Sequence, residues 1–279
     1  AYIDAHNRLI LNGEPFFPLG MYWGTVTPEQ LDVYAQSDFN CLMPYNSPTK
    51  EMMDAVHARG LKVIYSVKDL YFGSAGCPSD IRSEDEEYAK IKSYVEQFRD
   101  HPALMAWYIN DEMGVADVEK VREQYNVTRD LDQNHPVWMC DYRPEVMRRF
   151  WGTSDVYGVD WYPVAWLPVG AVVKGSAKAR DHVFSARPRW DAPQAHNLQT
   201  YNAGAVTARP PTLEEVRNMC YQSLCTGAMG LVSLCYDDLK RSPQDPGYSF
   251  LTSTKTFEEQ WRDVTTVAAE IRAISPILL

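Results

Sequence analysis

Two adjacent carboxylates follow an amide at the end of an apolar run. The segment HPALMAWYINDEMG (101–114) passes from an aromatic-rich stretch directly to Asn110, Asp111 and Glu112. A pair of carboxyl groups can cleave a glycosidic bond when one protonates the leaving oxygen and the other acts as nucleophile or base. Neighbouring strand residues point to opposite faces, so Asp111 and Glu112 can serve one site only where the strand has ended and the backbone turns.

The rest of the chain must position these groups, and it alternates apolar and amphipathic segments. Such near-continuous apolar strands suit a parallel sheet that is buried on both faces. Eight strand-helix units within 279 residues predict a single (β/α)8 TIM barrel over 1–279, either alone or as a piece of a longer chain. The alternative is another α/β topology with an open edge. The segments expected to be strands are 15–24, 39–46, 62–71, 104–112, 137–145, 156–164, 189–199 and 230–239.

The first residues predict a β-hairpin ahead of the barrel. YIDAH and RLIL are followed by Asn12-Gly13, a dipeptide that favours a two-residue turn, and then by PFFPLG. The fold class expected is therefore α/β, a single barrel preceded by a short N-terminal β-hairpin.

Aromatic, amide and acidic residues dominate the expected carboxyl ends of the strands, where the functional residues of barrels gather. Aromatic faces cover the C–H side of a sugar ring, and amides and carboxylates bind its hydroxyls. These residue types therefore predict a carbohydrate substrate. The residues expected to contact it are Asn110, Trp23, Tyr45, Asp141, Trp161, Tyr162, Gln194, His196 and Tyr236.

Several segments resemble clan A glycoside hydrolases. INDEM (109–113) resembles their acid/base motif, in which an amide or acid precedes the proton-donating Glu, and HPALMAWY resembles the lead-in to it. RLILNGEPFFPLGMYW resembles their N-terminal hairpin and first strand, and 209–238 resembles their seventh helix and eighth strand. The resemblance implies that Glu112 is the general acid, and that Asp111 or Asn110 binds a substrate hydroxyl or acetamido group. For this role we expect Glu112 to be buried against Trp or Tyr.

The sequence departs from the clan at the seventh strand. Gln194 stands where the clan has its nucleophilic Glu, and an amide can neither form a glycosyl ester nor act as a base at neutral pH. Asp160 is the best-placed substitute, with Asp141 next and Asp237 or Asp238 behind. The predicted catalytic residues are therefore Glu112, Asp160 and Asp111.

Two alternatives remain open for the function. Asp111 and Glu112 could hydrolyse N-acetylated sugars with the substrate's own acetamido oxygen as nucleophile. The protein could instead be a non-catalytic carbohydrate-binding barrel, which Gln194 favours. Lys68, at the end of the third strand, also leaves a Schiff-base enzyme open, for which no other signal exists.

Charge and motifs bear on other functions. The net charge of −10 argues against a nucleic-acid or anionic-membrane surface, and we expect neither partner. No stretch approaches the ~18 apolar residues of a membrane span. We expect no cofactor and no metal, since the sequence has neither a phosphate loop nor a cluster of metal ligands.

Most of the six cysteines lie in apolar runs and are expected to be buried free thiols, with loop residue Cys77 the candidate for a disulfide. We expect an extracellular or periplasmic location, and no oligomeric state is predicted.

Overall fold

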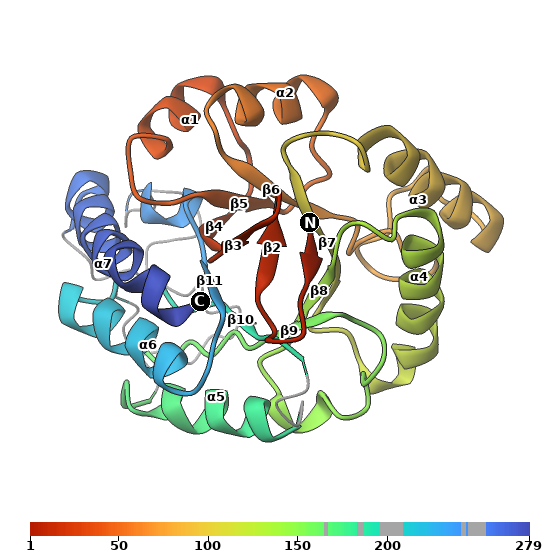
Figure 1. Ribbon diagram of the computed structural model, residues 1–279. Coiled ribbons are helices and arrows are strands. Elements are labelled where there is room, and N and C mark those ends of the chain that lie inside the picture. Colours follow the sequence, from red (N-terminus) through yellow and green to blue (C-terminus); the bar gives the residue numbers. More distant parts are fainter. Residues whose placement is uncertain (165–166, 183–186, 196–208, 241–243, 245–254) are drawn as a thin grey trace.

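Eight parallel strands form the centre of the protein (Figure 1). The computed structural model describes residues 1–164, 167–182, 187–195, 209–240, 244 and 255–279. The barrel strands are β4 (Leu19–Trp23), β5 (Cys41–Pro44), β6 (Lys62–Ser66), β7 (Leu104–Asp111), β8 (Val137–Cys140), β9 (Val156–Gly158), β10 (Trp190–Asp191) and β11 (Gly230–Ser233).

The sheet curls until its two end strands meet. Its order is β10-β11-β4-β5-β6-β7-β8-β9. An isolated parallel bridge joins Tyr157 of β9 to Arg189, and the amide of Ala192 donates to Val159 O at 2.9 Å. These contacts nearly close the sheet into a barrel, as the sequence predicts, and they leave no place for the alternative with an open edge.

Helices surround the barrel (Figure 1). They are α1 (Pro28–Tyr34), α2 (Lys50–Ala58), α3 (Glu84–Phe98), α4 (Val118–Leu131), α5 (Ala171–His182), α6 (Leu213–Cys225) and α7 (Phe257–Leu278), with 3₁₀ turns η1 (Val115–Asp117), η2 (Pro144–Val146) and η3 (Asp237–Lys240). Between β8 and β9 the chain uses η2 and further turns in place of an α-helix. Each strand is shorter than the apolar segment that predicted it, because the flanking apolar residues pack in the connecting loops.

A small antiparallel sheet covers the amino-terminal end of the barrel (Figure 1). It consists of β1 (Tyr2–Ile3), β2 (Leu9–Leu11) and β3 (Glu14–Phe16) in that order. Asn12 and Gly13 both have positive φ, +54° and +88°, as the predicted two-residue turn requires. Leu9 packs with the side chains that fill the barrel interior, so this sheet seals one end. The carboxyl ends of the strands lie at the opposite end.

Apolar side chains form two layers, one on each side of the barrel wall. Leu19, Met21 and Trp23 of β4 belong to the layer between barrel and helices, whereas Tyr22 belongs to the interior. The interior also contains Tyr108 and Trp138. The alternation of side chains along each strand therefore decides which residues can reach a ligand at the carboxyl end.

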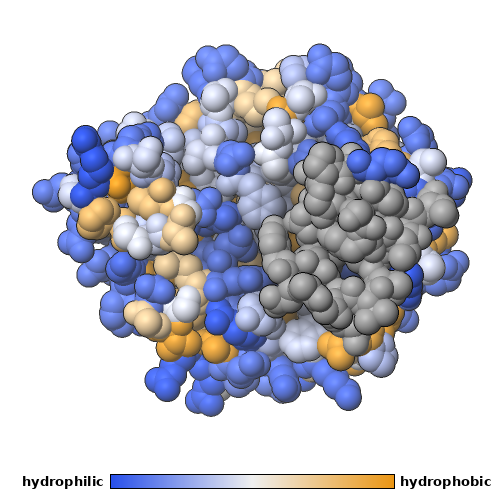
Figure 2. Space-filling view, turned by 180° about the vertical axis from the view of Figure 1, so that it is seen from behind, coloured by the Kyte–Doolittle hydropathy of each residue, from blue (hydrophilic) through white to orange (hydrophobic). Residues whose placement is uncertain are grey.

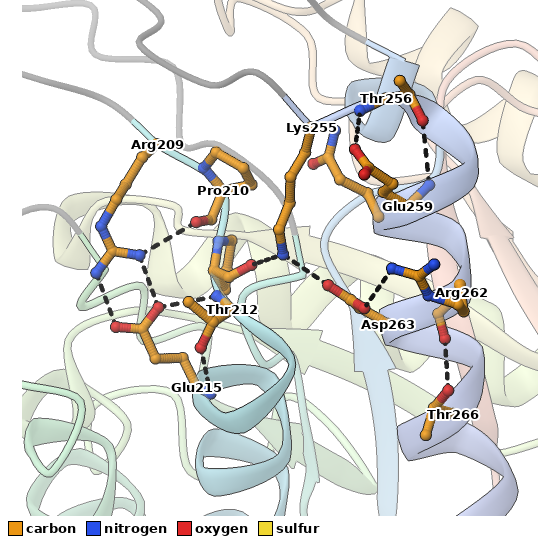
Figure 3. Close-up of polar contacts among 12 residues, drawn as sticks. Arg209, Pro210, Thr212, Glu215, Lys255, Thr256, Glu259, Arg262, Asp263 and Thr266 are labelled. Carbon is orange, nitrogen blue, oxygen red and sulfur yellow. Dashed lines mark hydrogen bonds and ion pairs between the residues drawn. The ribbon is translucent and has the colours of Figure 1, made fainter.

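Ion pairs and caps hold the segments that lead into α6 and α7 (Figure 3). Thr212 and Thr256 each form a reciprocal capping box, with Glu215 and Glu259 respectively. Lys255, just before α7, donates to Pro211 O at 3.2 Å and to Asp263 at 2.6 Å. The entries to the last two helices are thus tied to each other.

The cysteines agree only in part with expectation. All six lie in described residues and are free thiols, so the disulfide considered for Cys77 is absent. Four are buried, whereas Cys77 is half-buried and Cys225 is exposed. Among the helices in the described part of the chain, none has the length and apolar character needed to cross a bilayer.

Candidate active site

A β-bulge sets the direction of the polar residues at the end of β7. Tyr108 pairs with Trp138 and Asn110 with Met139, so Ile109 is an extra residue in the ladder between them. The extra residue shifts the alternation by one position. Asn110 consequently lies beside Met139, on the outer side of the wall. Asp111 pairs with Cys140, whose side chain belongs to the interior, and therefore turns inward.

Glu112 follows β7 in a left-handed backbone conformation. Its φ is +58°, and its amide still donates to Cys140 O at 3.0 Å. This turn brings the Glu112 side chain to the same site as Asp111, as the sequence requires if the two are to act together. Glu112 is exposed at the carboxyl face, so the expected burial of this side chain against Trp or Tyr is wrong.

The carboxyls of Glu112 and Asp160 lie side by side, close enough for the one to raise the pKa of the other. Asp160 lies just after β9 and is buried, with 4% of its surface exposed. Burial raises the pKa of Asp160 well above its usual range, and the hydrogen bond and charge of Glu112, followed by the charges of Asp111 and Asp141, raise it further. Asp160 therefore holds a proton to higher pH than an exposed aspartic acid does. Its Oδ1 is buried without a hydrogen-bond partner, so it is free to bind a hydroxyl or a water.

Four tyrosines surround the acidic pair. The hydroxyls of Tyr22 and Tyr108 lie 3.2 Å apart, and the Tyr45 ring centre lies 5.3 Å from that of Tyr22. Burial raises the pKa of Tyr162, and the next largest causes are the nearby Asp160 and Tyr45. Burial likewise raises the pKa values of the other three phenols, so all four are hydrogen-bond donors at physiological pH.

Asp111 is held by a phenol and an ammonium group. Tyr108 donates its hydroxyl to Asp111 Oδ1 at 2.8 Å, and Lys68 Nζ lies 3.4 Å from Asp111 Oδ2. Lys68 also pairs with Asp69 at 2.9 Å and lies over the ring of Tyr45, 5.1 Å from its centre. Both oxygens of Asp111 are therefore engaged.

Asp141 serves an arginine rather than the open site. Its fully buried carboxylate accepts from Arg143 Nε at 2.9 Å and from Arg143 Nη2 at 2.8 Å. The same Nη2 donates to the main-chain oxygens of Glu112 and Met113, each at 2.9 Å. Asp141, predicted as a substrate contact or second catalytic group, is thus at the site but behind Glu112.

The amides predicted as substrate contacts bond to the main chain. Gln194 is fully buried and accepts from the amide of Val164 at 2.9 Å. The Asn110 Oδ1 accepts from the amide of Met113 at 3.0 Å. These bonds shape the loops after β9 and β7. The carboxylate of Asp237, considered earlier as a second catalytic group, accepts from the amides of Gly24 and Thr25.

Three aromatic residues predicted to contact substrate lie on the outer side of the wall. Trp23 is fully buried, and its ring centre lies 4.1 Å from that of Tyr236 and 4.9 Å from that of Tyr34. Tyr236 also packs against Trp261 of α7. Trp161 packs on α5 where Gly175 leaves room for its ring. These positions correct the predictions for Trp23, Tyr236 and Trp161. His196 lies outside the described residues.

The sequence reasoning passed over Tyr22, Tyr108 and Arg143 as site residues. Tyr22 precedes Trp23 and takes the opposite, inward face, and the alternation along β4 does not by itself say which of the two points inward. Tyr108 looked like one more apolar residue of a long buried run. No sequence signal marks Arg143 as the partner of main-chain oxygens thirty positions away.

The described residues of the site include no cluster of metal-binding side chains. Within the described residues, no group of three or more His, Cys, Asp or Glu side chains could hold a metal ion. Figure 2 shows the molecule from the side opposite to that of Figure 1, and hydrophilic residues predominate over the described surface of this face. Paired carboxyls, phenols and an ammonium group can exchange protons with, and hydrogen-bond to, a polyhydroxylated ligand.

Solved structures with a similar fold include proteins described as glycoside hydrolases. A structure described as a glycoside hydrolase superposes with a TM-score of 0.69 at 14% identity, covering 99% of this chain and 73% of its own. A beta-glucuronidase of an uncultured Clostridium species gives 0.64 at 14% identity and covers 96% of this chain. A putative alpha-L-fucosidase from Bacteroides thetaiotaomicron gives 0.61 at 8% identity, covering 95% of this chain and 98% of its own.

These likenesses concern the fold. This chain spans 52% of the length of the Clostridium beta-glucuronidase, and the match with two further beta-glucuronidases spans 46% and 32% of their lengths. Neither comparison with protein-family models nor comparison with curated protein sequences gave a match.

Proposed function

We propose that this protein is a glycoside hydrolase in which Glu112 is the general acid and Asp160 is the second catalytic carboxyl group. The observation that carries the proposal is the adjacent pair of carboxyls at the carboxyl face of the barrel, in which exposed Glu112 lies beside buried Asp160 with its unpartnered Oδ1. The glycoside hydrolases among the fold neighbours support the same class of reaction. Clan A membership, with Gln194 in place of the usual nucleophile, is part of this proposal.

The pair has to open when substrate binds. Retaining enzymes separate their carboxyls by about 5–5.5 Å and inverting enzymes by about 6.5–9.5 Å, and two carboxyls that share a proton lie closer together than either. Glu112 is exposed and can turn away, while Asp160 is buried and fixed. As the pair opens, the proton that the two carboxyls share would pass to Glu112, which leaves Asp160 ionised. Glu112 would then donate that proton to the glycosidic oxygen, and Asp160 would attack the sugar or accept a proton from the attacking water.

The other two interpretations have less support. Substrate-assisted hydrolysis needs Asp111 to orient an acetamido group, and both of its oxygens already have partners. A binding barrel without turnover is consistent with the main-chain bond of Gln194. That interpretation gives no account of the buried, unpartnered oxygen of Asp160 beside Glu112.

The first test is hydrolysis of a panel of p-nitrophenyl glycosides and oligosaccharides. We expect Glu112→Gln to lower kcat at least about 100-fold, since general acid catalysis contributes roughly 10²–10⁴-fold. Glu119→Gln is the matched control, because Glu119 is a surface residue of α4 that pairs only with Arg122 among the contacts described. A loss below about tenfold in Glu112→Gln would contradict the assignment. Sugar binding with no hydrolysis across the panel would favour the binding barrel.

A second measurement assigns the role of Asp160. Nuclear magnetic resonance of the freshly released sugar gives its anomeric configuration. Retention would make Asp160 a nucleophile, and inversion would make it a base on water. Either way, we expect Asp160→Asn to lower kcat by a similar factor to Glu112→Gln. Full activity in Asp160→Asn would remove Asp160 from the mechanism.

A further inference from the structure

Glu112 holds a main-chain conformation that its residue type disfavours. Among the described residues, the non-glycine positions with positive φ are Asn7, Asn12 and Glu112. Asn tolerates this region because its short side chain bonds locally, whereas Glu has no such local compensation and is strained there. Contacts from the rest of the protein must therefore keep Glu112 in this conformation.

Those contacts can be named one by one. The amide of Glu112 donates to Cys140 O, and the amide of Met113 donates to Asn110 Oδ1, each at 3.0 Å. The carbonyl oxygens of Glu112 and Met113 both accept from Arg143 Nη2 at 2.9 Å. Arg143 is the one side chain in this set that bonds to Glu112 itself, and it binds the two consecutive carbonyls where the chain turns.

The side chain of Arg143 is itself held in place by Asp141 and Tyr142. Asp141 is fully buried and binds the guanidinium through Nε at 2.9 Å and Nη2 at 2.8 Å, and it also accepts from the Arg143 amide at 2.8 Å. The ring of Tyr142 lies 5.0 Å from the guanidinium carbon. A planar guanidinium bound in this two-pronged way has little freedom to move.

We propose that Arg143 is a positioning residue for the catalytic acid: fixed by Asp141, it holds the left-handed turn that directs the Glu112 carboxyl onto Asp160. This inference rests on the proposed function for its effect on turnover. Its structural part, the contact between Glu112 and Asp160, can be measured whether or not a substrate is found.

The direct readout is the titration of Asp160. With carboxyl-¹³C aspartate incorporated, the Asp160 signal is identified as the one missing from Asp160→Asn. Glu112→Gln is the reference, because it removes the neighbouring charge and lowers the pKa of Asp160. If Arg143 directs Glu112, Arg143→Met lowers the pKa of Asp160 toward that reference. An Asp160 titration that is unchanged in folded Arg143→Met would overturn the proposal.

The second readout uses leaving groups. A misplaced acid matters most when the leaving group is poor, because a good one departs with little protonation. For the sugar found in the panel, we expect Arg143→Met to lower kcat about 10- to 100-fold on the methyl glycoside and less than threefold on the 2,4-dinitrophenyl glycoside. A misplacement of about 1 Å is enough for such a loss. Equal losses of kcat on both glycosides would indicate that Arg143 has only a structural role.

Two further variants serve as a matched control and as a substitute if Arg143→Met does not fold. Arg217→Met removes another two-pronged arginine–carboxylate pair, with Glu270 between α6 and α7, and should change neither the Asp160 titration nor the leaving-group ratio. If Arg143→Met does not fold, Arg143→Lys replaces it, because a lysine ammonium can reach one carbonyl but cannot keep the two-pronged bond to Asp141. A shift of the Asp160 pKa in Arg143→Lys supports the proposal, and a wild-type titration contradicts it.

Discussion

Tyr108 and Asp111 are hydrogen-bonded at 2.8 Å although they are three residues apart on one strand. On a regular strand, residues three apart point to opposite faces. The bulge at Ile109 removes this conflict, so the phenol and the carboxylate share the barrel interior. The hydrogen bond orients the Asp111 carboxylate next to Glu112. Its importance can be tested by removing the hydroxyl oxygen of Tyr108.

Tyr108→Phe is expected to lower both activity and stability, whereas a matched variant on the outer side of the wall should lower stability alone. The substitution removes the phenol that binds Asp111, so the ion pair with Lys68 remains as the contact of this carboxylate. It also removes the hydroxyl group that lies 3.2 Å from the Tyr22 hydroxyl. Hydrogen bonds to charged groups contribute roughly 1.5–3 kcal/mol, so kcat/KM should fall about tenfold or more. Tyr65→Phe is the control, because Tyr65 donates to Pro48 O on the outer side of the wall. Chemical denaturation should show a loss of about 1 kcal/mol for Tyr65→Phe and roughly 1.5–3 kcal/mol for Tyr108→Phe. An equal loss of activity in both variants would contradict the role of Tyr108.

Asp160→Asn should stabilise the protein near neutral pH. The pKa of Asp160 is raised by burial and by Glu112, so the folded state holds a proton that the unfolded state releases. Asp160 therefore favours folding most below its unfolded pKa of about 3.9, and this contribution is lost as pH rises through the raised folded pKa. Near pH 7 the variant should have the higher Tm, by about 2–4 °C for each kcal/mol recovered.

The pH dependence makes this prediction specific. Thermal unfolding of both proteins between pH 4 and pH 8 should show the advantage of Asp160→Asn shrinking as the pH falls. Asp141→Asn is the matched control, since its carboxylate is paired with Arg143 and the variant should be less stable than wild type at neutral pH. A Tm for Asp160→Asn below that of wild type at pH 7 would contradict the raised pKa.

Asp191→Asn should destabilise the barrel strongly. Arg189 donates to Asp191 at 2.6 Å with both side chains almost completely buried, and it also binds Thr226 and Ser223 at the end of α6. Removing one partner of a buried ion pair costs about 3–5 kcal/mol, because the other charge remains uncompensated. Urea denaturation measures this. The exposed pair of Arg180 and Asp181 is the comparison, and Asp181→Asn should cost less than about 1 kcal/mol.

The architecture of the protein could be predicted from sequence because it depends on patterns that repeat. Eight apolar segments and intervening amphipathic ones specify a parallel barrel whatever the details of each loop. Asn12-Gly13 specifies its turn by backbone preference alone. Glu112 and Asp160 could be proposed because each follows a strand at the end where barrels keep their functional groups.

The side of the barrel wall to which each side chain points was harder to predict. Trp23 and Tyr22 are neighbours, and only the curvature of the finished barrel decides which of them is inside. The bulge at Ile109 depends on pairing with β8, so the inward turn of Asp111 and the outward turn of Asn110 leave no local signal. Arg143 and Glu112 are brought together by the fold itself, over a separation that no local pattern spans.

The bulge in β7 also bears on how such a barrel can change over time. The bulge absorbs one additional residue, so Asn110 still lies opposite Met139 and Asp111 opposite Cys140. Loss of Ile109 would leave the same pairs in a regular ladder, and the residues after it would keep their faces. A strand end of this kind can therefore gain or lose one residue while the functional groups beyond it keep their orientation.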